Sequence, residues 1–357
     1  MSAQPAPLAA DPGRRGGPPS FAYGGQALLE GVLMRGRNAI AVALRHPDGR
    51  IVTATERLDS RVHTSRYGRW PFVRGLVVLY ETLVIGTRWL IRSANVQAEE
   101  DDVELGKGTI AVTLIITFGV AIAIFSLLPL FISSVATSGA SQGWAQPAVE
   151  GLIQVALFLA YLTFVSRTPD IYRVFQYHGA EHMTIHALEA GDPLTVDEVR
   201  KYPTAHHRCG TEFLVILVLL SIFAFSLVGR QEPLVMVASR FIGIPVLAAV
   251  GYEVLKLGAK FRHNRLVRAI MFPGILVQMI TTKRPTDDMI EVAISSMEEA
   301  LAADGNPVPE GSTVFERYPL ELPTPGAASE PSDGVPTSGV ATDGVATATP
   351  GEPPAVS

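Results

Sequence analysis

The chain has 357 residues, of which 48% are hydrophobic and 18% are charged, and its formal net charge at pH 7 is −5. Soluble domains carry about 25% charged residues, so the composition indicates a membrane protein whose expected partner is the lipid bilayer. The mild charge, with no basic block, argues against a nucleic-acid partner. Cys209 is the single cysteine, which excludes an intramolecular disulfide and is typical of a reducing compartment.

Residues 1–20, "MSAQPAPLAADPGRRGGPPS", contain no apolar core, so they are predicted to be a disordered leader and not a signal peptide. Residues 21–107 are predicted to form a cytoplasmic segment with a β-hairpin and an interfacial helix. In the hairpin, "AIAVALRH" and "RIVTATER" alternate, and "PDG" between them supplies a turn proline and a glycine with positive φ. The glycines of the preceding "GGQALLEGVLMRG" indicate close backbone contacts.

The apolar stretch from 71 to 91, "PFVRGLVVLYETLVIGTRWLI", is long enough to cross a membrane but is not predicted to do so. It carries Arg74, Glu81 and Arg88 at intervals of seven residues, which places them near one helical face. This pattern favours a helix that lies in the membrane interface or packs on the helical bundle.

Four other apolar runs approach or exceed the roughly 20 residues that cross a bilayer. They are residues 108–140, 148–166, 213–228 and 234–258. The predicted fold class is therefore mainly α: a polytopic helical membrane protein with about four transmembrane helices and a small N-terminal cytoplasmic part that contains the β-hairpin. Two transmembrane hairpins, 108–166 and 213–258, are separated by a cytoplasmic loop, 167–212.

Lysine and arginine residues indicate the orientation in the membrane. They gather before the first predicted span, between the second and third, and after the fourth, whereas the turn from 137 to 147 has none. Because basic residues are enriched on the cytoplasmic side, we expect both termini and the central loop to be cytoplasmic in a multi-pass protein of the cell (inner) membrane.

The central loop contains "YHGAEHMTIH" (177–186) on a helix predicted to begin after Thr168 and to end at Gly191. His178 and His182, at positions i and i+4, can bind one metal ion, and Glu181 lies on the same stripe. His-x-x-Glu-His is the inverted zincin pattern, in which the glutamate acts as general base. The alternative is an ordinary solvated helix face.

A second polar cluster, "HHRCGTE" (206–212), immediately precedes the third predicted span. If the second and third spans pack antiparallel, the two clusters meet at the cytoplasmic membrane surface. His206 or Cys209 would then complete a site with three protein ligands and one open position for a divalent metal such as zinc. The alternative is that these side chains solvate the membrane surface and bind lipid headgroups.

Residues 259–303 are predicted to form interfacial and amphipathic helices. "LVRAIMFPGILVQMI" (266–280) is interrupted by Pro273 and Gly274, which is typical of an interfacial or re-entrant segment. "TDDMIEVAISSMEEALA" (286–302) is an amphipathic helix with Thr286 as N-cap. Residues 304–357, rich in Pro, Gly, Thr and Ala, cannot bury enough apolar surface to offset their ordering entropy and are predicted to be a disordered tail.

Four stretches together resemble the YqhQ-type bacterial membrane proteins: "GGQALLEGVLMRG", "YHGAEH", "VRKYPTAHHRCGTEFL" and "TTKRPTDDMIEVAI", spread over about 24–300. That family is a group of unknown function often labelled metal-dependent enzymes. The resemblance implies that the functional residues are Glu30, Arg35, His178, Glu181, His182, Glu189, His206, Arg208 and Cys209. His186 and His207 depart from the family pattern, which favours His206 as the third ligand.

Two functions follow as hypotheses. The first is a metal-dependent hydrolase at the cytoplasmic face, acting on a lipid-linked or peptide substrate. His178, His182 and His206, or Cys209, would bind the metal, Glu181 would activate water, and Arg208 would stabilise negative charge. The second is a non-enzymatic membrane assembly or metal-handling and transport factor. Haem ligation is a weaker third hypothesis, because no histidines face one another inside the predicted spans.

Overall fold

The computed structural model describes residues 21–58, 70–98, 107–138, 145–206, 209–228, 232–261 and 264–320. The predicted leader, most of the predicted tail, and the predicted site residue Arg208 lie outside these ranges.

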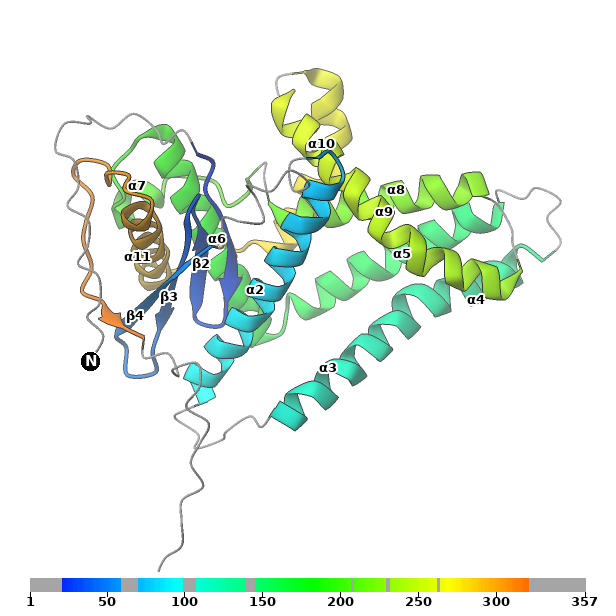
Figure 1. The fold of residues 1–357 in the computed structure, drawn as a ribbon, viewed down its shortest axis with the longest axis horizontal. Helices are drawn as coiled ribbons and strands as arrows, with labels where there is room; N and C mark the ends of the chain where they lie inside the picture. The colour runs from blue at the N-terminus through cyan, green and yellow to red at the C-terminus, as the bar shows by residue number, and fades with distance from the viewer. Residues whose placement is uncertain are drawn as a thin grey trace, which may run out of the picture. The chain divides into compact units, whose positions relative to one another are not determined.

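The N-terminal part forms a sheet in the order β1-β2-β3-β4-β5 (Figure 1). Strands β1 (Gly24–Leu28), β2 (Gly31–Arg35), β3 (Ala39–Arg45) and β4 (Ile51–Arg57) form an antiparallel meander, and β5 (Tyr318–Pro319) pairs parallel to β4. The predicted hairpin is confirmed as β3–β4, and Gly49 in its turn has a φ of 89°.

Strands β1 and β2 occupy the glycine-rich stretch. The sequence predicts close backbone contacts there but no strands. Those contacts are present. A Cβ on Gly25 would lie 2.4 Å from the carbonyl oxygen of Leu33, and one on Gly31 would lie 2.4 Å from that of Ala43. Glycine therefore lets this hairpin approach its neighbours more closely than any other residue could.

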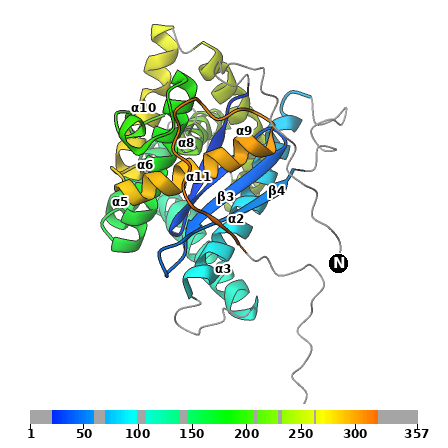
Figure 2. The same ribbon diagram turned by 90° about the vertical axis from the view of Figure 1, so that its left-hand side faces the viewer.

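The two faces of the sheet bury different helices (Figure 2). On one face, Val32, Met34 and neighbouring side chains pack against α6 (Pro169–Ala190) and α11 (Asp287–Ala303). On the other face, residues such as Val42 and Leu44 pack against Trp89 and Val96 of α2 (Val73–Ala98). Because strand side chains alternate between faces, a sheet covered on both sides is apolar throughout, as "AIAVAL" in β3 is.

Three helices in the described part of the chain are long and apolar enough to cross a membrane: Ala111–Ala136, Ala145–Val165 and Gly210–Leu227. The first comprises most of α3 (Lys107–Ile122), a π-helical turn η3 (Ala123–Leu127) and α4 (Leu128–Ala136). The other two are α5 (Ala145–Val165) and α8 (Gly210–Val228). The chain is therefore a helical membrane protein.

The fourth predicted span, 234–258, is not among these three helices. It falls within one continuous helix, α9 (Pro233–Lys260), which runs through Pro245. Several side chains of α9 are outside the description, so a fourth crossing stays a prediction.

Helix α2 packs on protein, as its charge spacing indicated. Each of the three charges spaced seven residues apart has a partner on another element. Arg74 donates to Glu253 of α9 at 2.8 Å, Glu81 pairs with Arg35 of β2 at 2.8 Å, and Arg88 pairs with Glu56 of β4 at 2.6 Å. These pairs fix which side of α2 faces the sheet and α9.

Two boundary predictions differ from the structure. Pro273 and Gly274 do not interrupt the helix, because α10 (Arg265–Thr281) continues through both. Gly274 packs instead against Glu212 of α8, whose Cγ would lie 2.5 Å from an added Cβ. The glycine is therefore explained by close helix packing.

The predicted tail also begins too early. After α11 the chain from 304 to 320 runs beside the sheet, where Leu320 N donates to Thr53 O at 2.8 Å. Arg317 forms an ion pair at 3.1 Å with buried Glu298, and Phe315 packs on the core of α6 and α11. A few specific side chains thus order a stretch whose average composition predicts disorder.

Candidate metal centre

Helix α6 carries the histidine motif, and from Tyr177 to Leu188 most of its residues are buried against the sheet and α11. It begins after Thr168, with Pro169 in the first turn, and ends at Gly191, whose φ is 78°. Both ends match the prediction. Glu181 and His182 are only 3% and 1% exposed, so the alternative of a solvated helix face is wrong.

The two histidines of the motif are oriented by main-chain carbonyls. His178 Nδ1 lies 2.9 Å from Thr281 O, and His182 Nδ1 lies 2.6 Å from Thr204 O. A carbonyl oxygen can only accept, so each Nδ1 carries the proton. Each Nε2 is then an acceptor with its lone pair turned away from the carbonyl, the arrangement found in metal-ligating histidines; that of His178 accepts from the Cys209 thiol at 3.1 Å.

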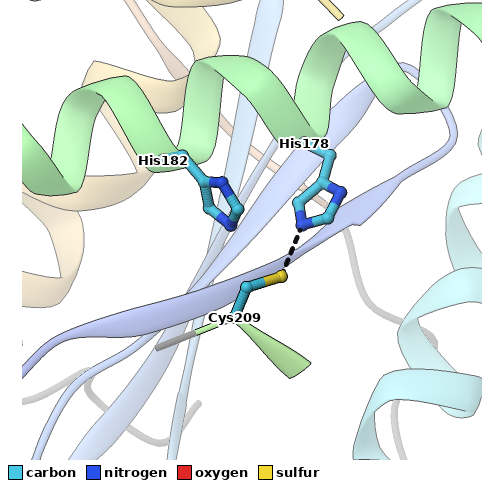
Figure 3. Close-up of side chains that lie close together, drawn as sticks. All are labelled: His178, His182 and Cys209. Atoms are coloured by element: carbon cyan, nitrogen blue, oxygen red, sulfur yellow. Dashed lines mark hydrogen bonds between the residues drawn. The ribbon is translucent and has the colours of Figure 1, made fainter. Parts of the chain in front are cut away.

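Cys209 lies where these lone pairs converge (Figure 3). Its Sγ is 3.1 Å from His178 Nε2, and one ligand atom from each of His178, His182 and Cys209 lies within 4.8 Å of the others. His182 Nε2 is buried and has no hydrogen-bond partner in the described part of the chain. A buried nitrogen without a hydrogen-bond partner costs free energy. A metal ion bound to His182 Nε2 would offset that cost.

Burial also determines the charge of these groups. It lowers the pKa of His182 well below the ordinary value, and the neighbouring imidazoles lower it further. Burial raises the pKa of the Cys209 thiol. Without a metal, both groups are therefore neutral at pH 7, and Cys209 is a poor nucleophile.

Glu181 interacts electrostatically with His178 and Cys209 and accepts a hydrogen bond from the backbone N–H of Gly25. Its Oε2 is buried and has no hydrogen-bond partner among the described residues. Burial raises the pKa of this carboxyl to about 8, an effect that the nearby His178 partly offsets. A carboxyl whose pKa lies near the working pH can both take up and release a proton.

A supporting residue that the sequence did not single out is Gln278 of α10, which is fully buried. Its side chain binds both backbone groups of His206, accepting from N at 2.8 Å and donating to O at 2.9 Å. This double hydrogen bond holds the segment that supplies Thr204 O and Cys209. A buried amide in an otherwise apolar helix was the available signal.

Gly179 brings the end of α10 to α6. A Cβ at this position would lie 2.1 Å from Lys283 O, which no side chain could accommodate. The neighbouring backbone bond from Lys283 N to Phe175 O is 2.8 Å long. The "HGAEH" glycine therefore allows the carbonyl of Thr281 to reach His178.

His206, the favoured third ligand in the sequence interpretation, lies after α6 in the chain and packs beside the C-terminal part of that helix, near His186 and Glu189. Its ring centroid is 5.7 Å from that of His182 and 4.6 Å from that of His186, and its Nε2 is 3.6 Å from Glu189. The structure thus brings Cys209, and not His206, to the pair of histidines.

The other residues implied by the resemblance join elements of the fold. Glu30 receives hydrogen bonds from Arg173 at 2.6 Å and from Tyr177 at 3.2 Å, and both partners precede the histidines on α6. Arg35 pairs with Glu81 of α2. These contacts connect the hairpin β1–β2 to the helices on its two faces.

Comparison with known proteins gives a family and no activity. Residues 70–303 match the model of a family described as a protein of unknown function, DUF1385. The chain is 34% identical over 293 residues to the uncharacterised protein YqhQ of Bacillus subtilis (strain 168), an alignment that covers 78% of this chain and 92% of that protein. No solved structure matches the chain.

Proposed function

We propose, for a chain that belongs to the DUF1385 family, that His178, His182 and Cys209 bind a divalent metal ion and that the site performs hydrolysis at the cytoplasmic face of the membrane. Zinc is the ion that suits this donor set best, because imidazole nitrogen and thiolate sulfur are its usual ligands.

One observation carries the proposal: both histidines donate Nδ1–H to main-chain carbonyls and turn Nε2 toward the same sulfur. Orientation of this kind fixes the tautomer that a metal needs. A satisfied core histidine would use its second nitrogen in a hydrogen bond, which His182 does not do within the described residues.

The chemistry divides among the residues as follows. Three protein donors with one position left open are the pattern of catalytic zinc, which when bound supplies a Lewis acid and lowers the pKa of water. Glu181 interacts with His178 and Cys209 and, with its raised pKa, takes up the proton of the attacking water. Arg208 stays a candidate for stabilising negative charge, on the sequence argument alone.

The position in the chain supports a substrate at the membrane surface. Cys209 immediately precedes the apolar helix Gly210–Leu227. Thr281, which orients His178, ends α10. The distribution of lysine and arginine assigns this side to the cytoplasm. A lipid-linked or peptide substrate is consistent with such a location.

The alternative is a metal-handling or assembly factor that binds the ion without catalysis. A purely structural zinc site uses four protein ligands, whereas three converge in the described part of the chain. The adjacent Glu181, buried with one oxygen unpaired, further favours catalysis, because a storage site gains nothing from a base there.

The test is metal analysis of the full-length protein purified in detergent without chelators. Wild type should contain about one zinc per chain, and His182→Ala should contain almost none. His186→Ala is the matched control: it lies one turn further along α6, bonds Ala205 O through Nε2, and should keep its metal. Metal-free wild type would refute the proposal.

Catalysis is tested separately with Glu181→Gln. This variant should retain the metal while losing the ability to complement a deletion strain, because glutamine cannot accept the proton. If Glu181→Gln complements fully and still binds metal, the metal-handling alternative holds.

A further inference from the structure

Helix α2 has an apolar face that no described part of the chain covers. Its large side chains there are 37% to 69% exposed; they are spaced three or four residues apart from 73 to 83, and two more follow at 84 and 90: Val73, Leu76, Tyr80, Leu83, Val84 and Leu90. A surface helix of a soluble protein has the opposite arrangement, with its apolar stripe turned toward the core.

The orientation of α2 is set by its other sides and is not arbitrary. Gly86 and Trp89 are buried against the sheet, where a Cβ on Gly86 would lie 2.2 Å from the side chain of Gln26. The ion pairs of Arg74, Glu81 and Arg88 act at intervals of two turns along the helix. Rotating α2 to bury its apolar face would break all of these contacts.

The N-terminal end of α2 identifies what covers the face. Gly75 lies against Tyr252, and Arg74 against Glu253, near the end of α9. Lys256 and Lys260 follow on α9 and are exposed, which agrees with the predicted fourth span ending here on the cytoplasmic side. Trp70 and Phe72, both half exposed, begin the stripe with the aromatic residues typical of the membrane interface.

The sheet under α2 prevents the helix from crossing the bilayer. Glu56, the partner of Arg88, belongs to β4, whose neighbouring Thr55 and Arg57 are exposed. Exposed polar side chains and open strand edges are excluded from hydrocarbon. The C-terminal half of α2 must therefore stay at the level of the water-exposed sheet, while its N-terminal end meets α9 at the membrane surface.

We propose that α2 lies along the cytoplasmic leaflet, with its stripe from Val73 to Leu90 buried at the boundary of headgroups and acyl chains. The occupant of the apolar face is the lipid bilayer, because the chain has helices that can cross a membrane and the stripe follows directly on the exposed aromatic residues Trp70 and Phe72. Helices of this kind bury their apolar face in that boundary. The sheet is thereby docked on the membrane, whether or not the metal centre is catalytic.

The experiment places a nitroxide label on α2 in full-length protein reconstituted into phosphatidylcholine–phosphatidylglycerol vesicles. Leu83→Cys and Tyr80→Cys put the label on the stripe. Asn95→Cys, exposed on the same helix beyond the stripe, is the matched control. Buried Cys209 labels poorly, and wild-type protein provides its background.

Dissolved oxygen concentrates in the bilayer, whereas a charged nickel chelate stays in water. Oxygen should therefore relax the labels at Leu83 and Tyr80 more strongly than nickel does, and the order should reverse at Asn95. Stronger nickel relaxation at Leu83 would mean that water covers the stripe. Inaccessibility to both reagents would mean that protein covers it, and dipolar broadening between labels would identify a second copy. Each of these three results overturns the proposal.

Discussion

Helices α2 and α6 both carry charged or polar side chains at regular helical spacing, yet the two sets differ in whether their side chains have partners. On α2, Arg74, Glu81 and Arg88 each meet an opposite charge from another element. On α6, Glu181 and His182 are buried deeper, and each leaves one side-chain atom without a hydrogen-bond partner in the described structure. Paired groups hold a fold together, whereas a buried group without a hydrogen-bond partner that also lies in a cluster of metal-ligating side chains is a candidate for ligand binding or catalysis.

The comparison has a physical basis. Leaving a buried polar group unsatisfied costs about 1–3 kcal/mol, and the helix could have avoided this with alanine or leucine. The cost on α6 is understandable if metal binding, which is coupled to folding free energy, offsets it.

The largest effect is expected at Cys209. Cys209→Ser should weaken zinc binding by more than the roughly 10–100-fold that loss of an outer-shell partner causes, because a serine hydroxyl replaces the thiolate. His206→Ala should stay within that range, since His206 lies beside His182 and Glu189. Competition titration with a chromogenic zinc chelator measures both. The reverse ranking would restore His206 as the third ligand.

The sequence named His178 and His182 as ligands and left the third ligand open between His206 and Cys209. His178 and His182 were found because i and i+4 spacing is a property of any helix. The positions of Cys209 and His206 relative to α6 are tertiary features, and the backbone of His206 is held by Gln278. The carbonyls of Thr204 and Thr281 orient both imidazoles. Every residue has a backbone carbonyl, so the amino-acid sequence could not predict which ones would do this.

The fold divides in the same way. The β3–β4 hairpin, the ends of α6 and three membrane helices follow from local patterns. The strands β1 and β2 were missed because glycine weakens the strand signal. The ordered stretch up to residue 320 was missed because composition averages over the few side chains that anchor it, such as Arg317.

The second prediction concerns that anchor. Glu298 is buried, and its ion pair comes from Arg317 at 3.1 Å. Ending the chain at residue 309 should destabilise it by about 3 kcal/mol, the low end for removing one partner of a buried pair. Ending it at residue 320 should be neutral. Thermal unfolding in detergent, followed by intrinsic fluorescence, measures both. Equal stability of the two truncations would show that the 310–320 segment contributes no anchor.

The third prediction tests the paired side of the comparison. Arg35→Ala should lower stability by about 1 kcal/mol, and the double variant with Glu81→Gln should reveal a coupling energy of similar size. The two side chains are 24% and 14% exposed, so solvent screens part of their attraction. Zinc content should not change. Loss of zinc from Arg35→Ala would assign this residue to the site and blur the distinction between α2 and α6.

The smallest effect is a pH dependence at Glu298, the buried carboxylate that has a charged partner and no role at the metal centre. Burial raises its pKa above the ordinary 4.5, and Arg317 offsets part of the shift. The folded state therefore binds this proton more tightly than the unfolded state. The stabilisation from Glu298 is complete below pH 4.5 and is lost as pH rises through the folded pKa.

Glu298→Gln removes the titrating group, so its stability relative to wild type should increase from pH 4.5 to pH 8. The unfolding temperature of both proteins, measured in the same detergent across this range, gives the difference. If that difference is constant with pH, Arg317 fully compensates the burial of Glu298. A buried carboxylate beside an opposite charge would then cost no stability, like the ion pairs on α2. Only buried groups without a counter-charge, such as Glu181 with its pKa raised to about 8, would lower stability in a way that indicates function.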